Sequence, residues 1–200
     1  MKPDLQRIIE LQRLLAKFNE VERAVHRKHL GKFVHENDTE HSYNLAITAW
    51  YLASHFPKLD RDLVIRYGLI HDLVEVHAGD TYIYGSAEHL DSKETREAEA
   101  LKQLESEWPD FKELTDHIHD YEAKKNPESQ FIYALDKIMP IMQIYIHDGY
   151  SWKKNNVTAK MLHEAKITRL SKVGESPEIL SYFKELYALL LERPDLINKE

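Results

Sequence analysis

Apolar residues recur every three or four positions along most of the chain, which is the spacing of helices that bury one face. The pattern predicts helices over residues 4–19, 40–55, 60–79, 92–107, 110–122, 126–146, 158–172 and 177–191. Asn126-Pro127 and Ser176-Pro177 strengthen two of these starts, because a capping side chain followed by proline is typical of a helix N-terminus. Residues 20–39 are polar and rich in histidine, and we expect a loop or a short helix there; another loop is expected over 80–91.

No segment shows the strict alternation of apolar and polar residues that marks a half-buried strand. The expected fold class is therefore all-α, a compact single-domain helical bundle of about seven to nine helices. The length of 200 residues suits one domain with a sizeable core, and we expect that domain to span residues 1–200.

Composition narrows the possible functions. Cysteine is absent, which excludes disulfides, a thiolate nucleophile and a zinc–sulfur site, so any metal must be held by histidine and carboxylate. The net charge of −7 argues against binding to a nucleic acid polymer or to an anionic membrane, since both need a basic face. The first residues do not resemble a signal peptide, and no apolar run approaches ~20 residues. We expect a cytoplasmic protein.

The stretch Leu69-Ile70-His71-Asp72-Leu73-Val74 carries the strongest chemical signal in the chain. An imidazole and a carboxylate stand side by side in an apolar segment, where burial without partners costs about 2–7 kcal/mol for a neutral polar group and more for a charge. A metal ion would compensate both groups. Glu75 follows on the same helical face, and Asp80 comes after the expected helix end at Gly79.

Two further candidates lie far away in the sequence. His41 stands at the head of a predicted helix, in Glu40-His41-Ser42-Tyr43. Asp136 interrupts the apolar run from Phe131 to Met142, so its carboxylate should be paired, protonated or bound to a metal.

In this order the residues resemble the H…HD…D pattern of the HD-domain metal-dependent phosphohydrolases. The branch that contains the 5′-deoxynucleotidases is the most similar, and the resemblance spans roughly residues 10–150. It rests on segments around His41, His71-Asp72 with Glu75 and Gly79-Asp80, Lys93-Glu94 with Arg96-Glu97, and Leu135-Asp136-Lys137.

The resemblance implies one divalent metal ion (Co, Mn, Fe, Ni, Zn or Mg) held by His41, His71, Asp72 and Asp136. It implies a catalytic role for Glu75 in proton transfer or in positioning water, and for Asp80 in contacting the nucleophile or the sugar. The metal-site core would cover about residues 35–145, with C-terminal helices over 157–192 packed on it.

The expected reaction is hydrolysis of a small phosphomonoester, most consistent with a (deoxy)nucleoside 5′-monophosphate. A homodimer is a further expectation from the family. These nucleotidases hold the phosphate and the base with an Arg-Trp pair before the first histidine. Arg27 is the nearest match and the predicted substrate-binding residue, with Arg23 and Lys28 as alternatives, but no tryptophan follows it.

Other interpretations remain open at this point. His71-Asp72 alone could be a satisfied buried pair, Glu75 could only orient a ligand histidine, and Asp80 could be a turn residue. Arg27 lies in a charged segment that could be a solvated face. For the whole chain, the alternatives are a metal-stabilised regulatory or interaction module without turnover, and a diiron oxygenase on the same scaffold, which needs additional histidine ligands.

Overall fold

The computed structural model describes residues 2–81, 88 and 91–198 of the chain. In chain order the elements are α1 (Leu5–Phe18), β1 (Glu22–His29), β2 (Lys32–Asn37), α2 (Asp38–Ala53), α3 (Arg61–Ile70), α4 (Glu75–Ala78), α6 (Lys93–Glu107), α7 (Lys112–Ala123), α8 (Pro127–Ile146), α9 (Tyr150–Lys154), α10 (Ala159–Val173), α11 (Pro177–Leu191) and the short 3₁₀ helix η1 (Pro194–Leu196). The predicted all-α, helical-bundle fold class is confirmed. The predicted loop over 80–91 lies largely outside the described residues.

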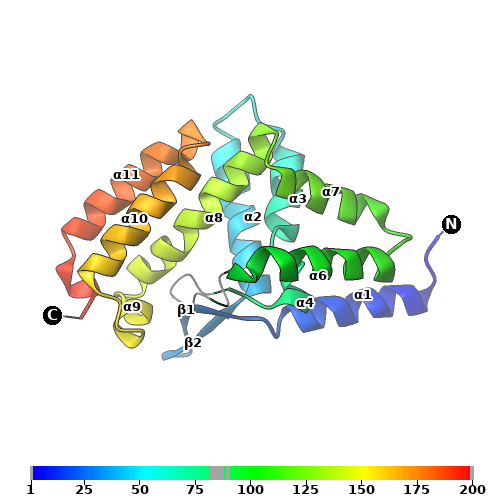
Figure 1. The fold of residues 1–200 in the computed structure, drawn as a ribbon, viewed down its shortest axis with the longest axis horizontal. Helices are drawn as coiled ribbons and strands as arrows, with labels where there is room; N and C mark the ends of the chain where they lie inside the picture. Colours follow the sequence, from blue (N-terminus) through cyan, green and yellow to red (C-terminus); the bar gives the residue numbers. More distant parts are fainter. Residues whose placement is uncertain (1, 82–87, 89–90, 199–200) are drawn as a thin grey trace.

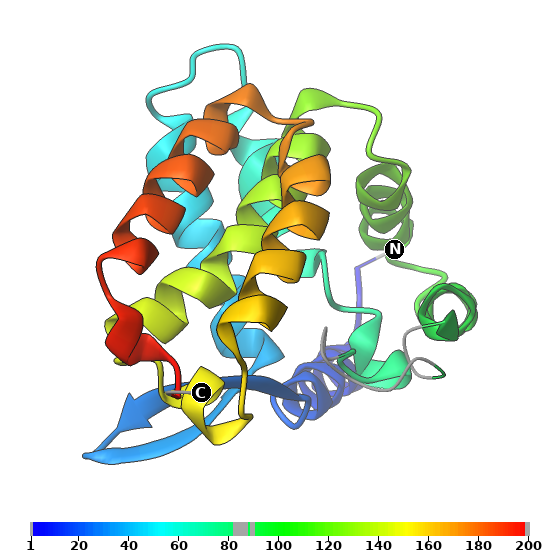
Figure 2. The same cartoon turned by 60° about the vertical axis from the view of Figure 1, so that its left-hand side comes forward.

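The long helix α8 runs through the centre of the molecule, with α2 and α3 on one side and α10 and α11 on the other (Figures 1 and 2). Apolar residues from these helices form the main core, and Phe131, Ile132, Leu135 and Ile138 of α8 are fully buried in it. A second apolar cluster is formed by side chains of α1, α6, α7 and the segment that includes α4. Leu104 and Ile118 are fully buried in it. The polar side chains of the site lie between these two cores.

The prediction of one helix over residues 60–79 is wrong in its second half. Helix α3 ends at Ile70, residues 71–74 form a turn, and the short α4 follows. The apolar pattern continues through this turn because the chain passes from one core to the other. Val64 and Tyr67 belong to the main core, whereas Leu73 and Val74 pack in the second cluster. Hydrophobic periodicity does not show that the segment packs against one core before the turn and against the other after it.

The loop or short helix expected over residues 20–39 is an antiparallel hairpin of β1 and β2. Its two-residue turn, Leu30-Gly31, has positive φ at both positions (47° and 81°), as the tight turns favoured in hairpins require. His26 pairs with His35 across the strands, and an irregularity in register lies between Glu22 and His26. Because the two strands are rich in charged residues and histidine, they lack the alternation of apolar and polar residues that predicts strands. Gly31 at the turn was a usable signal for a hairpin.

Helices α2 and α3 cross at very short range. A Cβ atom added at Gly68 would lie 2.8 Å from the Cα atom of Ala46, so no larger residue fits without moving a backbone. Both helices are thereby held side by side next to the central α8. No helix within the described ranges has the length and apolar character needed to cross a membrane.

Candidate metal centre

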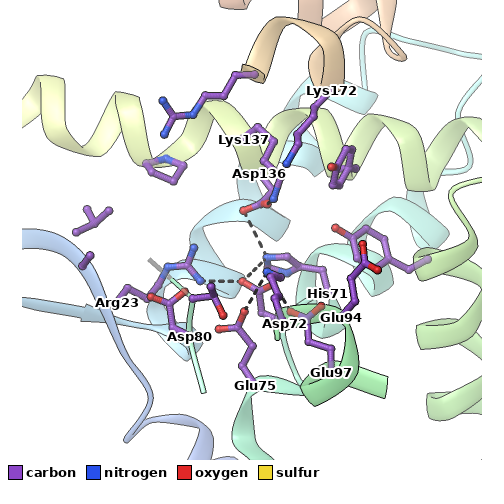
Figure 3. A pocket seen from close by; sticks show the side chains of 18 of the residues that line it. Arg23, His71, Asp72, Glu75, Asp80, Glu94, Glu97, Asp136, Lys137 and Lys172 are labelled. Carbon is purple, nitrogen blue, oxygen red and sulfur yellow. Dashed lines mark hydrogen bonds and ion pairs between the residues drawn. The ribbon is translucent and has the colours of Figure 1, made fainter. Parts of the chain in front are cut away.

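Four side chains from three regions of the chain converge at the junction of the two cores. His41 comes from the first turn of α2, His71 and Asp72 from the end of α3 and the following turn, and Asp136 from the middle of α8. One potential ligand atom from each lies within 4.8 Å of the others. Figure 3 shows His71, Asp72 and Asp136 pointing toward one another. The structure thus brings together the four residues that the sequence singled out.

Local sequence fixes where His41 stands. Asn37 caps α2: its side-chain oxygen accepts a hydrogen bond from the backbone N–H of Glu40 at 2.9 Å. The Glu40 carboxylate accepts one in return from the backbone N–H of Asn37 at 3.2 Å. This reciprocal capping box sets the first turn of the helix, so His41 enters the site one residue after it.

The hydrogen bonds of the histidines fit a metal site. The Nδ1 atom of His71 lies 3.0 Å from the carbonyl oxygen of Gly68, which can only accept, so Nδ1 carries the proton. The other ring nitrogen, Nε2, is buried, has no hydrogen-bond partner and lies 3.0 Å from Asp72 Oδ2. For His41, Nε2 lies 3.0 Å from Asp136 Oδ1, and Nδ1 lies 3.6 Å from Glu36 Oε2. Metal-binding histidines are usually oriented by a hydrogen bond on the far nitrogen, and the Gly68 carbonyl supplies one to His71. The separation of 3.6 Å between His41 Nδ1 and Glu36 Oε2 is too long for such a bond.

The carboxylates of this cluster are held in the charged form. Burial raises the pKa of Asp136, but Lys137 and His41 more than offset that effect and hold the pKa well below its usual range. Burial also acts against ionised Asp72, yet His71 and Arg23 lower its pKa. Burial lowers the pKa of His71, and its carboxylate neighbours Asp72 and Asp136 raise it to about 10. The donor set is therefore anionic and attracts a cation, and two imidazoles with two carboxylates suit a divalent ion.

A cavity of about 410 Å³ opens onto the cluster and is lined by His71, Asp72 and Asp136. Its volume falls within the range of small-molecule sites. Glu75 and Asp80 both line it, as expected. Burial, together with nearby Asp72, raises the pKa of Glu75 well above its usual value, and burial likewise raises the pKa of Asp80. Glu75 therefore retains a proton at a pH at which an exposed glutamate has lost it.

The structure does not bring Arg27 to the cavity. Its guanidinium pairs with the Glu40 carboxylate, with Nε 2.6 Å from Oε2, and it is not among the described residues that line the cavity. Arg23 occupies the cavity wall instead, where Nη1 donates to Asp72 Oδ2 at 2.7 Å and to Asp38 Oδ1 at 2.8 Å. The strand register explains the difference, because the irregularity between Glu22 and His26 changes which side chains of β1 face inward.

Several residues of the site were missed by reasoning from sequence. Glu36 and Asp38 are buried beside His41 and Arg23, in the segment for which the sequence predicts a loop or a short helix. Lys93 lies 3.0 Å from Glu97 and 3.9 Å from Glu75 and lines the cavity, although sequence reasoning assigned it no role of its own. The usable signal was its place in the Lys93-Glu94 motif. The two cavity cations on α10, Arg169 and Lys172, had no sequence signal.

Comparison with known proteins adds independent support. A family model described as HD domain matches residues 17–178 of the chain. The 5′-deoxynucleotidases HDDC2 of mouse and cattle are 31% and 32% identical to it over 112 residues. The aligned part is 54% of this chain and 54% or 52% of those relatives. The chain thus spans about half the length of the curated relatives it matches.

Solved structures agree over a longer range. A crystal structure described as a predicted metal-dependent phosphohydrolase from Magnetospirillum magnetotacticum superposes with a TM-score of 0.75 and 28% identity. That likeness covers 99% of this chain and all of the other. An HD-domain phosphohydrolase from Listeria innocua shares the fold with a TM-score of 0.64 at 16% identity.

Proposed function

The chain belongs to the HD domain family, and from this premise we propose that it is a metal-dependent phosphohydrolase acting on a small phosphomonoester. The observation that carries the proposal is the convergence of His41, His71, Asp72 and Asp136 on one point, with the His71 Nε2 atom buried and without a hydrogen-bond partner there. When bound there, a divalent ion supplies Lewis-acid chemistry to a phosphoryl oxygen.

In this proposal Glu75 is the group that handles protons. It lies on the cavity wall, is 3% exposed, and keeps its proton to a higher pH than usual because burial and Asp72 disfavour its charge. A protonated carboxyl in this position suits donation to the leaving alkoxide oxygen of the substrate. Asp80, on the same wall, is proposed to orient the attacking water or the sugar.

The finer part of the proposal is the substrate, a (deoxy)nucleoside 5′-monophosphate. The similarity to 5′-deoxynucleotidases over 112 residues supports it. The cavity also offers aromatic surface from Tyr121, Tyr133 and Trp152, against which a base can pack. Residues 1–200 are proposed to form one domain, since α10 and α11 share the main core with α2, α3 and α8.

A phosphatase screen tests the proposal. The protein is stripped with a chelator and reloaded with Mn²⁺ or Co²⁺, then given a panel of nucleoside and deoxynucleoside 5′-monophosphates. We expect phosphate release that depends on added metal and is abolished, together with metal binding, by Asp72→Ala. The matched control is Asp62→Ala, which removes an exposed carboxylate from the start of α3 and should leave both intact.

Bound metal without turnover on any phosphomonoester would refute the enzyme and leave a metal-stabilised module. Two ions per chain in the purified protein would contradict the single-ion site. Equal rates for ribo- and deoxynucleotides would remove the deoxynucleotide preference and leave the phosphohydrolase standing.

A further inference from the structure

Among the described residues, six with cationic side chains line the cavity, and they fall into two groups. Four of them pair with a carboxylate: Arg23 with Asp72, Lys93 with Glu97, Lys124 with Glu122 and Lys137 with Asp136. Arg169 and Lys172 make no ion pair or hydrogen bond with any residue in the part of the chain that the structure describes. The paired cations balance charges that the protein already holds, so only the second group has positive charge to spare.

Arg169 is the more unusual of the two. Its residue is only 8% exposed, and its Nη1 atom is buried without any hydrogen-bond partner. A guanidinium carries five N–H donors and cannot lose its charge in a protein, so leaving one buried and unpaired is costly. Arginine in such a position usually binds a carboxylate or a phosphate, whose oxygens match its forked geometry. The structure contains the donor of such an interaction and lacks the acceptor among the described residues.

Lys172 stands one turn away on the same face of α10, at the i+3 position. Figure 3 shows it descending from α10 toward Lys137 and Asp136, across the cavity from Arg23, Glu75 and Asp80. Helix α10 runs antiparallel to α8 (Figure 1). Arg169 precedes Lys172 in α10 by one turn, toward the start of α10, which lies nearer the C-terminal half of α8. The two cations thus extend from the metal ligands along the cavity wall.

The local field is consistent with a missing anion. Burial lowers the pKa of Lys172, and the positive charges of Lys137, Lys93 and Arg169 lower it further. Like charges gathered in this way repel one another, and a bound anion relieves that repulsion. The chain carries a net charge of −7, so a dianionic substrate also needs local positive charge in order to enter.

We propose that Arg169 and Lys172 form the phosphate-binding arm of the site, in which a helix outside the HD motif holds phosphate oxygens of the substrate. Their two positive charges match a dianionic phosphate group. The arm takes the role that the sequence assigned to Arg27, which the structure places elsewhere. The identification of the phosphate as part of a substrate rests on the proposed phosphohydrolase function, whereas the binding of phosphate itself does not.

The test compares Arg169→Gln and Lys172→Gln with Lys160→Gln, which removes a charge from an exposed position on the same helix. Calorimetric titration of the metal-loaded protein with inorganic phosphate measures binding without turnover. We expect the affinity to fall about ten- to hundredfold in either α10 variant, as the loss of a charge-assisted hydrogen bond implies, and to stay unchanged in Lys160→Gln. Arg169→Lys should recover part of the loss because it keeps the charge.

Steady-state kinetics locate the phosphate that is held. With p-nitrophenyl phosphate, whose only phosphate is the scissile one, a rise in KM with little change in kcat would place the arm on that group. A rise in KM seen only with a nucleoside 3′,5′-bisphosphate would place it on a second phosphate. Both results support the arm. Thermal melting checks folding, and the exposed Lys172 keeps the test available if Arg169→Gln does not fold.

The two proposals fail separately. Phosphate binding that weakens in the α10 variants, in a protein that hydrolyses nothing, would keep the arm and refute the phosphohydrolase. Metal-dependent hydrolysis with the same KM and phosphate affinity in wild type and both variants would refute the arm and keep the enzyme. A wild-type protein that neither binds phosphate nor turns over any ester would refute both.

Discussion

Two pairs of histidine rings pack together in the described part of the molecule, and they lie in opposite electrostatic surroundings. The rings of His41 and His71 are 5.3 Å apart between centroids and face Asp72 and Asp136. The rings of His26 and His35 are 4.1 Å apart, as a cross-strand pair of the hairpin. The second pair meets a serine hydroxyl, a backbone carbonyl and a lysine, and no carboxylate is within ion-pair distance of either ring among the described residues.

The difference shows what makes a histidine pair a site. Carboxylates raise the pKa of His71 to about 10 despite burial. Burial, reinforced by His35 and Lys154, lowers the pKa of His26 to about 4. The carboxylates beside the first pair attract a cation. His26 of the second pair stays neutral, and the hairpin is fastened to α9 through Ser151 and the stacked rings of Phe33 and Tyr150. The presence or absence of neighbouring carboxylates, rather than the histidines themselves, distinguishes the candidate metal centre from the structural contact between the hairpin and α9.

The strongest test of this comparison removes one histidine from each pair. His71→Ala deletes a ligand, so we expect loss of the bound ion and a fall in kcat/KM of roughly a thousandfold or more, since a metal supplies several kcal/mol of transition-state stabilisation. His26→Gln should retain the ion and the activity. Elemental analysis of the purified variants, with a phosphatase assay, measures both. A folded His26→Gln protein without metal would break the distinction.

A second test separates metal binding from proton transfer within the first region. Glu75→Gln keeps the size of the side chain but removes its proton chemistry, so kcat should fall about 10²- to 10⁴-fold while the metal content stays at the wild-type level. A pH–rate profile should also lose the limb contributed by Glu75. Unchanged kcat would show that Glu75 only orients its neighbours.

The third test uses the lowered pKa of His26 in the second pair. Because the pKa of His26 is about 4 in the folded protein and near 6.5 when exposed, the unfolded chain binds the proton more tightly between these values. Stability is therefore lost as the pH falls from 6.5 to 4, by up to about 3 kcal/mol from this residue. Urea unfolding at pH 7 and pH 4 should show this loss in wild type and a smaller one in His26→Gln. Equal losses would place the effect elsewhere.

The smallest expected effect concerns only the contact between the hairpin and α9. Ser151 Oγ accepts a hydrogen bond from the backbone N–H of His26 at 2.7 Å, at a position where both residues are buried. Ser151→Ala should lower the free energy of unfolding by about 1–2 kcal/mol, because the N–H loses its partner. Metal affinity should not change. A change in metal affinity without loss of stability would mean that the two pairs communicate.

Sequence reasoning predicted the helical class and most helices, because amphipathic periodicity and capping residues such as Asn126 act locally. It did not predict the break after Ile70 or the hairpin at Glu22–Asn37. Both depend on tertiary partners: one segment moves between two cores, and the other forms strands from charged residues that pack on α9. Local propensity carries no information about such partners.

For the site, the sequence singled out His41, His71, Asp72 and Asp136, since polar residues in apolar surroundings require compensation. The exchange of Arg27 for Arg23 could not be predicted, because a register irregularity in a strand decides which arginine faces inward. Arg169 was equally hidden. A single arginine in an amphipathic helix has the appearance of a surface residue until its neighbours are known.

The close crossing at Gly68 has a consequence for how this protein can vary. The same residue sets the separation of α2 and α3, which carry His41 and His71, and supplies the carbonyl that fixes the proton of the His71 ring. Helix packing and ligand geometry are therefore coupled at one position. Any change that widens this crossing would move His41 away from His71, so the geometry of the proposed metal site depends partly on the absence of a methyl group between two helices.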